Sequence, residues 1–577
     1  MKIRYSLMTI VFLLIFSELC FAQWSTDASQ NTPICTAPNN QFAPQIVVDD
    51  KGNSIIVWED ETDPIGYRHI YAQRLNRYGC KMWDERGVPV CSAREYKKIA
   101  DVISDGEGGA IIVWLDYKNW FHPDPIEETD IYAQRIDSSG VMLWNSDGVD
   151  ICTAEGNQFN AKAISDNDGG VIVVWQDDRS EYNGVYIQHV INIGQILLSV
   201  NGKPLNSQGI VARFGGYNVV HSDSNSIIIF YASRKNNISI STAQKIRENG
   251  TYVWSENEKI LDISGKCISD NNEGAIFAYL VYQNGNPIEL RAQRITKEAI
   301  VIWPEFGTSI SEQVFRYSRY ELTKDDQCGA FIVWISNNDT TEDSLYLYIS
   351  RVDSSGQLLW IKKCLDKVST WYVTEGHHIV CGNEGEAILK FKIEISDTLW
   401  NQVIQKIDLS GNFLWGNNGI IYVDHNPKKR DIVCGTMTGD AFGGAIIVWD
   451  EFGANGWDIY AQQVSSRGQL GDVVSSIHSL NIEINPDYNL AQSYPNPFNS
   501  FINISYSFQK GGDVTIKLFN TNGQLVNTLV NKYQKEGNYD ISWNGRSSNG
   551  QNVVSGVYFY QLKINEFAQT KKLLLIR

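Results

Sequence analysis

Carboxylate side chains recur at one place in the sequence, where an apolar run ends in tryptophan. Asp60, Asp116 and Asp177 each stand two residues after such a tryptophan, at the start of an acidic segment. Carboxylates that converge from several loops can bind a cation or the hydroxyl groups of a glycan. The candidate ligand-binding carboxylates are Asp60, Asp116, Asp177, Asp178 and Asp450.

Two aromatic residues extend this candidate ligand site. Trp120 and Phe121 lie in the longest acidic segment, "LDYKNWFHPDPIEETD" (115–130), and their rings offer a platform on which a sugar can stack. The alternative is local, because an aspartate at a repeated position commonly accepts hydrogen bonds within its own turn. Both interpretations stay open at the level of sequence.

The sequence singles out no catalytic machinery. Paired carboxylates hydrolyse glycosides, but so many acidic pairs can be chosen here that no choice is informative. The chain has no G-x-S-x-G elbow, no P-loop, no HExxH and no sialidase-type "SxDxGxTW" box. The segment "DNDGG" (166–170) begins like a calcium loop but lacks its third acid and its distal glutamate, which favours a turn. We therefore expect no catalytic residue, no metal and no cofactor.

The elements that must position the acidic segments form an internal repeat. The apolar run "GGAIIVW" occurs at 108–114 and again at 443–449, with looser copies at 52–58, 169–175 and 328–334. A segment such as "IYAQR" (70–74) follows each copy, and then a turn glycine with a bulky pair, as in "SSGVMLW" (138–144). Three markers in constant order indicate a repeat protein. The last aromatics of the eight runs are Trp58, Trp114, Trp175, Phe230, Tyr279, Trp334, Phe391 and Trp449.

Each copy predicts four short β-strands. The second of these, "AIIVW" (110–114), is apolar at every position, so both of its faces must be covered. A β-propeller does this, because every four-stranded blade lies between two others. The eighth copy lacks its fourth strand, and the missing segment stands at the N-terminus, from Trp24 through "TPICTA" (32–37). The sequence therefore predicts an all-β, eight-bladed β-propeller over 23–480, closed by its N-terminal strand.

The ends of the chain and its charge indicate export. Lys2 and Arg4 precede an apolar run that ends at "CFA" (20–22), which predicts a signal peptide over 1–22. No later segment is apolar enough to span a bilayer, so we expect no transmembrane segment in the mature chain. The net charge of −17, without a long basic run, disfavours binding to nucleic acid or to an anionic membrane.

The cysteines do not predict a disulfide framework. Cys35, Cys91 and Cys152 occupy equivalent positions of the repeat, in "ICTA", "VCSA" and "ICTA". Equivalent positions lie one repeat apart, which is beyond the distance a disulfide can bridge, about 7 Å between Cα atoms. We expect these thiols to behave as small buried hydrophobic groups.

Beyond residue 480 the composition changes. Residues 481–493 read as a linker, and residues 494–577 alternate apolar and polar positions between glycine-rich turns, as in "VTIKLFN" (514–520). This alternation predicts a small, Ig-like β-sandwich of about seven strands.

The same tail resembles a known family. Its segments "YPNPFN" (494–499), "LFNTNGQLV" (518–526), "WNGRSSNGQNVVSGVYFYQL" (543–562) and "KKLLLIR" (571–577) are similar to C-terminal sorting domains of the bacterial type IX secretion system. The resemblance implies a secreted or cell-surface protein of a Gram-negative bacterium, with the type IX machinery as its partner. The residues that it marks as the sorting signal are Tyr494, Pro495, Asn496, Pro497, Phe498, Asn499, Gly556, Lys571 and Lys572.

Three functions are compatible with this organisation. The leading hypothesis is a non-catalytic binding module for a glycan or protein ligand. The alternatives are a polysaccharide hydrolase or lyase, and a structural or adhesive surface component.

Overall fold

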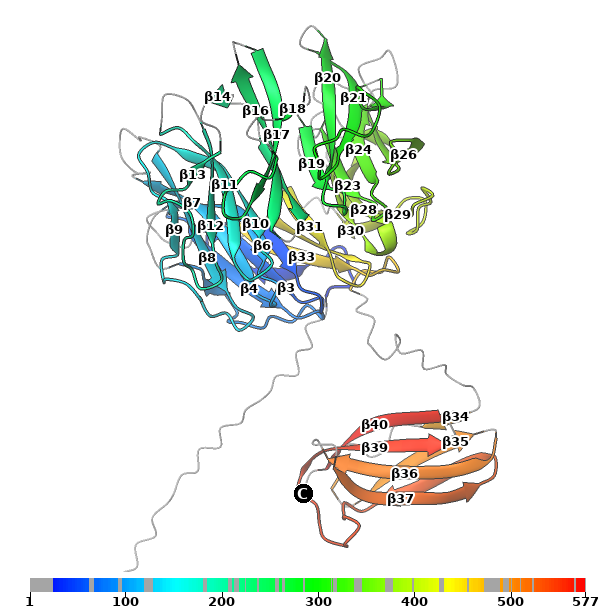
Figure 1. Cartoon of the computed structure of the whole chain (residues 1–577). Helices are drawn as coiled ribbons and strands as arrows, with labels where there is room; N and C mark the ends of the chain where they lie inside the picture. The colour runs from blue at the N-terminus through cyan, green and yellow to red at the C-terminus, as the bar shows by residue number, and fades with distance from the viewer. Residues whose placement is uncertain are drawn as a thin grey trace, which may run out of the picture. The chain divides into compact units, whose positions relative to one another are not determined.

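The computed structural model contains two compact units, residues 1–473 and 474–577 (Figure 1). We call them unit 1 and unit 2. No helix among the described residues has the length and apolar character needed to cross a membrane. The structure describes residues 24–575 except 62–66, 92–95, 119–127, 180–183, 206–209, 212–216, 224, 236–237, 255–258, 262–264, 284–285, 313, 315–318, 337–344, 369–376, 397–398, 425–429, 454–455, 472–487, 491–497, 500, 509, 521–523 and 565–566.

Unit 1 is all-β, and the part described contains eight antiparallel sheets, numbered here in chain order. Sheet 1 contains β2 (Gln41–Val48), β3 (Ser54–Asp60), β4 (His69–Leu75) and β5 (Val88–Pro89). Sheet 2 contains β6 (Tyr96–Ser104), β7 (Ala110–Lys118), β8 (Glu128–Ile136) and β9 (Val149–Cys152). Sheet 3 contains β10 (Gln158–Ser165), β11 (Val171–Asp177), β12 (Gly184–Val190) and β13 (Lys203–Pro204). Sheet 4 contains β15 (Tyr217–Asp223), β16 (Ser226–Lys235), β17 (Ile238–Arg247), β18 (Lys259–Leu261) and an added β14 (Ile210–Val211).

The remaining four sheets of unit 1 follow the same order. Sheet 5 contains β19 (Gly265–Ser269), β20 (Ala275–Gln283), β21 (Asn286–Ile295) and β22 (Thr308–Ser311). Sheet 6 contains β23 (Tyr320–Lys324), β24 (Ala330–Ser336), β25 (Leu345–Val352) and β26 (Leu358–Val368). Sheet 7 contains β27 (His378–Cys381), the 3₁₀ turn η2 (Asn383–Gly385), β28 (Ala387–Ser396), β29 (Leu399–Ile407) and β30 (Ile420–Val423). Sheet 8 contains β31 (Arg430–Gly439), β32 (Ala445–Phe452), β33 (Trp457–Val464) and, from the N-terminus, β1 (Thr32–Cys35).

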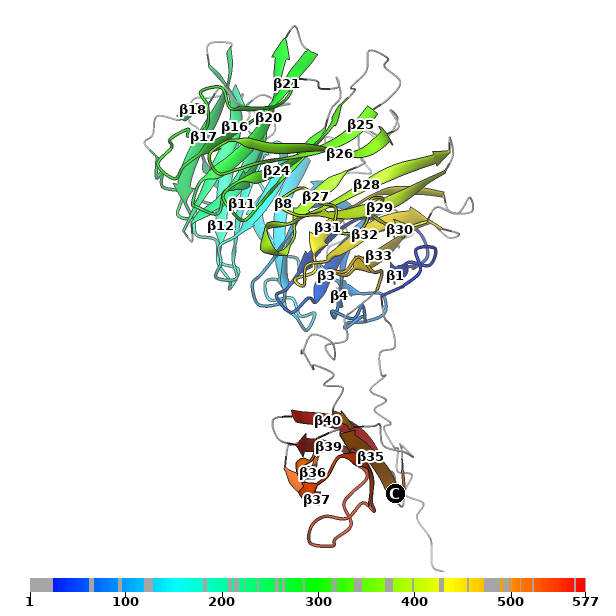
Figure 2. The ribbon, with the colours of Figure 1, turned by 90° about the vertical axis from the view of Figure 1, so that its right-hand side faces the viewer.

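The eight sheets form a closed ring. The first strand of each sheet contacts the first strand of the next, and β2 of sheet 1 contacts β31 of sheet 8. In the views of Figures 1 and 2, the yellow strands of sheet 8 accordingly lie beside the blue strands of sheet 1. The eight first strands therefore make the inner wall of the ring.

The second strand of a sheet is buried on both faces, and its side chains alternate between two neighbours. In β7, Ile112 and Trp114 pack in a cluster with sheet 1, whereas Ile111 and Val113 pack in a cluster with sheet 3. Successive side chains of a strand point to opposite faces, so a strand between two sheets is covered on both faces and is mostly apolar. All seven residues are buried in β3 and in β11. The apolar run that opens each repeat thus serves packing.

The ring is joined by contacts that recur between sheets. Trp144 is 8% exposed, and its indole Nε1 donates to the carbonyl of Asn192 in sheet 3 at 2.9 Å. At the junction of sheets 8 and 1 the equivalent residue is Trp24, which is 1% exposed and donates from Nε1 to the carbonyl of Arg77 at 3.1 Å. Nearby, β1 pairs with β33, with Thr32 opposite Ala461. The first residues of the described chain therefore complete the last sheet.

Unit 2 consists of two sheets over one core. One contains β34 (Tyr488–Leu490), β35 (Ile502–Phe508) and β38 (Gly537–Trp543). The other contains β36 (Gly512–Asn520), β37 (Leu525–Gln534), β39 (Gly556–Ile564) and β40 (Phe567–Leu575). Side chains of both sheets, such as Ile504 and Leu562, lie in the same buried cluster. Strand β34 falls within residues 481–493, which the sequence predicts as a linker. The sequence does not reveal this strand because three residues are too few to show an alternating pattern.

Candidate functional site

The predicted ligand-binding carboxylates lie inside strands. Asp60 ends β3, Asp177 ends β11, and Asp116 and Asp450 lie within β7 and β32. All four residues are at most 5% exposed. Residues two apart in a strand share a face, so each carboxylate placed two positions after a tryptophan enters the same space between sheets as that ring. The indole Nε1 of Trp175 accordingly donates to Asp177 Oδ2 at 2.9 Å.

The thiols of the repeat meet these carboxylates. Cys152 Sγ in β9 donates to Asp177 Oδ2 at 3.7 Å, across the boundary between sheets 2 and 3. Arg179 closes the group, because its Nε donates to Asp177 Oδ1 at 2.8 Å and its Nη2 lies 2.9 Å from the sulfur. Burial raises the pKa of Cys152 to about 12, so the sulfur keeps its proton and remains a donor. Thiol, carboxylate and guanidinium together join two sheets.

At two further boundaries the charge of a repeated carboxylate acts on a thiol. Burial is the first cause that raises the pKa of Cys91 to about 12, and the carboxylate of Asp116 adds to it. The pKa of Cys35 rises to about 11 by burial, with Asp60 again a contributor. All three cysteines are buried free thiols. The sequence shows both sets of residues and their constant phase in the repeat, but not that they meet across a boundary.

Asp116 also faces a cation within its own sheet. Lys97 Nζ of β6 lies 3.1 Å from Asp116 Oδ2, and the two side chains are 1% and 7% exposed. Opposite Asp116 on β8, Asp130 pairs with Lys118 Nζ at 2.7 Å. Two buried acids in this sheet are thus balanced by two lysines.

The remaining candidates have separate positions. Asp450 Oδ2 accepts a hydrogen bond from the backbone N–H of Ala43 in sheet 1 at 3.3 Å. Asp178 accepts from the Nδ2 of Asn157 at 3.3 Å. Trp120 and Phe121 lie outside the described residues. Asp60 and Asp450 thus lie at the boundary of sheets 8 and 1, whereas Asp177 lies at that of sheets 2 and 3. Within the described residues no group of three His, Cys, Asp or Glu side chains could hold a metal.

Sheet 8 contains a pair of facing acids. Glu451 and Asp458 are opposite each other on β32 and β33 and are 5% and 6% exposed. Trp449 Nε1 donates to Glu451 Oε2 at 3.3 Å. Burial first, and then the negative charge of Glu451, raises the pKa of Asp458 to about 6. Asp458 therefore holds its proton more tightly in the folded chain than in the unfolded chain, where an Asp pKa is about 3.9.

The stability of unit 1 is expected to depend on this proton. The contribution of Asp458 is full below about pH 4 and is lost as the pH rises through about 6, because only the folded state raises the pKa. Asp458→Asn should therefore raise the free energy of unfolding at pH 7 by about 1–3 kcal/mol and flatten its dependence between about pH 4 and 6. Urea unfolding at several pH values measures both effects. Asp50→Asn, at an exposed position, is the control, and an unchanged pH profile in Asp458→Asn would refute the assignment.

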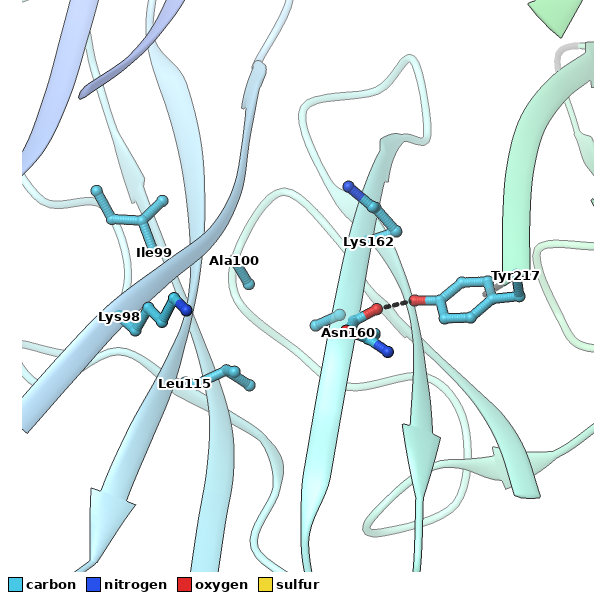
Figure 3. A pocket seen from close by; sticks show the side chains of 8 residues that line it. Lys98, Ile99, Ala100, Leu115, Asn160, Lys162 and Tyr217 are labelled. Carbon is cyan, nitrogen blue, oxygen red and sulfur yellow. Dashed lines mark hydrogen bonds between the residues drawn. The ribbon is translucent and has the colours of Figure 1, made fainter. Parts of the chain in front are cut away.

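A cavity of about 380 Å³ opens on the inner wall of the ring, between sheets 2, 3 and 4 (Figure 3). Lys98, Asn160 and Lys162 are exposed there, whereas Leu115 and Ala161 are buried. Polar side chains thus reach into a cavity that has apolar walls, as in many ligand sites. Its lining residues are Lys98, Ile99 and Ala100 of β6, Leu115 of β7, Asn160, Ala161 and Lys162 of β10, and Tyr217 of β15.

A β-bulge in β10 shapes this cavity. Phe159 pairs with Gln176 but Lys162 pairs with Val174, so Asn160 and Ala161 together stand opposite Trp175. Asn160 has a φ of 54°, which asparagine tolerates better than most residues. The hydroxyl of Tyr217, in the next sheet, hydrogen-bonds the carbonyl of Asn160 (Figure 3) and lies 2.6 Å from that of Val174. Bulges re-aim side chains and are frequent beside functional sites.

The sequence does not indicate this cavity. Lys98 and Lys162 stand in first strands, away from the acidic segments that follow the tryptophans. Two lysines inside strands whose other residues are mostly apolar were the available signal. The bulge that brings them to one cavity is not readable from the periodicity.

The residues of the predicted sorting signal are described in part. Phe498 is buried in the core of unit 2, its ring lies 5.6 Å from that of Trp543, and it forms a parallel bridge with Leu575. Gly556 begins β39, and Lys571 and Lys572 lie in β40 opposite Tyr560 and Phe559. Tyr494, Pro495, Asn496 and Pro497 lie outside the described residues.

The ring with its cavity and the separate two-sheet unit define an all-β protein of two parts. Residues 492–576 match the family model described as "Secretion system C-terminal sorting domain". This part of the chain is thus a type IX sorting domain, and the protein is secreted or displayed on the surface of a Gram-negative bacterium. The domain interacts with the secretion machinery.

Several solved structures match the chain at low sequence identity and low TM-score. PorZ, a surface component of the type IX secretion system of Porphyromonas gingivalis, is 10% identical, with 96% of this chain and 100% of that chain covered and a TM-score of 0.20. A polysaccharide lyase, ulvan lyase, is 10% identical, with coverages of 67% and 94% and a TM-score of 0.38. The β-propeller domain of the Trilobed protease from Pyrococcus furiosus is 9% identical, with coverages of 74% and 94% and a TM-score of 0.34. No curated protein matches the chain.

Proposed function

We propose that unit 1 is an eight-bladed β-propeller and unit 2 an Ig-like sandwich. The closed ring of eight sheets supports the first assignment, and two sheets over one core support the second. In this proposal residues 1–22 are a signal peptide, 23–480 the propeller and 494–577 the sorting sandwich. Residues 481–493 are the linker, apart from the strand at Tyr488–Leu490, which pairs within the sandwich.

We further propose that the exported chain is a non-catalytic binding protein whose ligand is a glycan. One contrast carries this proposal. The repeated carboxylates, which would be the catalytic groups of a hydrolase, are engaged in contacts within and between sheets, whereas the cavity keeps Lys98, Asn160 and Lys162 exposed. Trp120 and Phe121 remain candidates for an additional aromatic contact with a sugar.

The test is to measure binding and turnover on the same ligands. The mature full-length protein is screened on a glycan array, and each bound glycan is then incubated with the protein while reducing ends and unsaturated products are followed. Saturable binding without products is the expected result. Release of products would support the hydrolase or lyase alternative, and the absence of both binding and products would support a structural or adhesive role.

A further inference from the structure

We propose that the cavity between sheets 2, 3 and 4 binds an anionic group of an acidic oligosaccharide, either a uronate carboxylate or a sulfate ester. This inference rests on the proposed glycan-binding function and names the class of glycan. Its starting point is that Lys98 from β6 and Lys162 from β10 are both exposed and line the same cavity (Figure 3). Two ammonium groups supplied by different sheets can bind one anion from two sides.

The charges around Lys98 and Lys162 favour a short anionic ligand over a long one. Asp101 lies on β6 near Lys162, but its Oδ2 accepts the backbone N–H of Ala163 at 3.0 Å and its Oδ1 that of Val102 at 3.1 Å. Its carboxylate is thus held by backbone donors. The chain as a whole carries a net charge of −17. A long polyanion would therefore be repelled by most of the surface, and a short acidic unit that fits the cavity is favoured.

The cavity is held in shape before any ligand binds. Tyr217 is 6% exposed, and its hydroxyl hydrogen-bonds the carbonyl of Asn160 in the bulge and that of Val174 on the neighbouring strand β11. Burial raises the pKa of Tyr217 well above its ordinary value, so its hydroxyl stays a neutral donor. Asn160 is tethered as well, because its Nδ2 donates to Gln176 Oε1 at 2.6 Å. Rigid walls of this kind reduce the ordering cost of binding.

The size and the walls of the cavity favour a sugar. Its volume of about 380 Å³ lies at the lower end of ligand sites, which span about 300–1,000 Å³. Ile99, Ala100 and Ala161 supply small apolar contacts that suit the C–H faces of a pyranose ring. Lys98, Lys162 and the Asn160 amide supply the polar contacts. An acidic sugar combines these two requirements in one unit.

The experiment measures affinity by isothermal titration with the mature full-length protein. The probes are a uronate oligosaccharide, a sulfated oligosaccharide, a neutral oligosaccharide of the same length and an acidic peptide. Wild-type protein should bind at least one acidic oligosaccharide more tightly than the neutral one, with an affinity that falls as salt is raised. Lys98→Gln and Lys162→Gln should each weaken that binding about 10- to 100-fold, the effect of one charge-assisted hydrogen bond.

The matched control is Lys266→Gln, which removes an exposed lysine from the inner strand β19 outside the cavity. It should leave the affinity unchanged, and thermal unfolding should confirm that all three variants are folded. Equal affinity of the wild type for acidic and neutral oligosaccharides would overturn the inference while leaving glycan binding intact. Binding of the acidic peptide alone would overturn the glycan class. Binding of none of the probes would overturn both this inference and the proposed function.

Discussion

Trp24→Ala is expected to lower the free energy of unfolding of unit 1 by about 3–5 kcal/mol, the cost of truncating a buried tryptophan. Trp24 is 1% exposed and belongs to the cluster that joins sheets 8 and 1. Its Nε1 donates to the carbonyl of Arg77 at 3.1 Å, and Gln462 Nε2 donates to the carbonyl of the next residue, Ser25, at 2.6 Å. The substitution removes the contacts that hold the N-terminal segment in place.

The comparison is with Trp415→Ala, the same position in sheet 7. Trp415 is 5% exposed and donates to the carbonyl of Ser466 at 3.1 Å, but its segment is linked to both neighbouring strands by the chain. Trp24→Ala should lower the melting temperature more, because β1 pairs with β33 of sheet 8 but comes from the opposite end of the chain of unit 1. Deletion of residues 23–37 should have the largest effect, since it exposes the edge of β33. Calorimetry of the full-length chain measures all three, and an unchanged melting temperature after the deletion would contradict ring closure by the N-terminus.

Lys97→Met is expected to destabilise unit 1 by about 3–5 kcal/mol, because it leaves the charge of Asp116 buried without its ammonium partner. The two side chains are 1% and 7% exposed, and Nζ and Oδ2 are 3.1 Å apart. Replacing both residues, in Lys97→Met/Asp116→Leu, should recover most of that loss, since apolar groups of similar volume can substitute for a buried ion pair. Such a recovery would show that the loss comes from removing the ammonium beside the Asp116 carboxylate rather than from lost packing of the lysine.

Urea unfolding of the two single variants and the double variant gives the coupling energy. Lys118→Met is the matched control, because Lys118 also pairs with a buried aspartate, Asp130, but its side chain is 37% exposed. Water can replace this ammonium, so the expected cost is below about 1 kcal/mol. If Lys97→Met lowered the free energy of unfolding no more than Lys118→Met does, burial of the Lys97–Asp116 pair would not increase its contribution to stability.

The sequence predicts the sheets of unit 1 well because the apolar pattern that specifies each strand lies within that strand. A run such as Ile111–Trp114 has to be covered on both faces, and the phase of the tryptophans places each run in the same position of the repeat. The same phase shows where Asp177 and Cys152 stand but not that they meet, because they come from different sheets. Whether these acids face a ligand or a neighbouring sheet depends on the residues across the boundary between sheets. The periodicity of the sequence does not contain that information.

The cavity was not predictable for a different reason. Lys98 and Lys162 are 64 positions apart along the chain, and their approach depends on the bulge at Asn160 and on Tyr217 from a third sheet. A bulge changes which residues face inward without changing the apolar pattern of the strand beside it. Strand β34 escaped detection because three residues carry no period.

The bulges also break the symmetry of the ring. Among the described residues, first strands carry an inserted bulge opposite the second-strand aromatic residue in sheets 8, 1, 2 and 3, whereas β19, β23 and β27 pair without any shift of register. An undistorted eightfold repeat would offer a small molecule eight equivalent places. In this protein one arc of the wall differs from the other, and the cavity lies at one end of the bulged arc, between sheets 2, 3 and 4. Although the chain is built from similar repeats, the bulges make the inner wall of the ring different on its two sides.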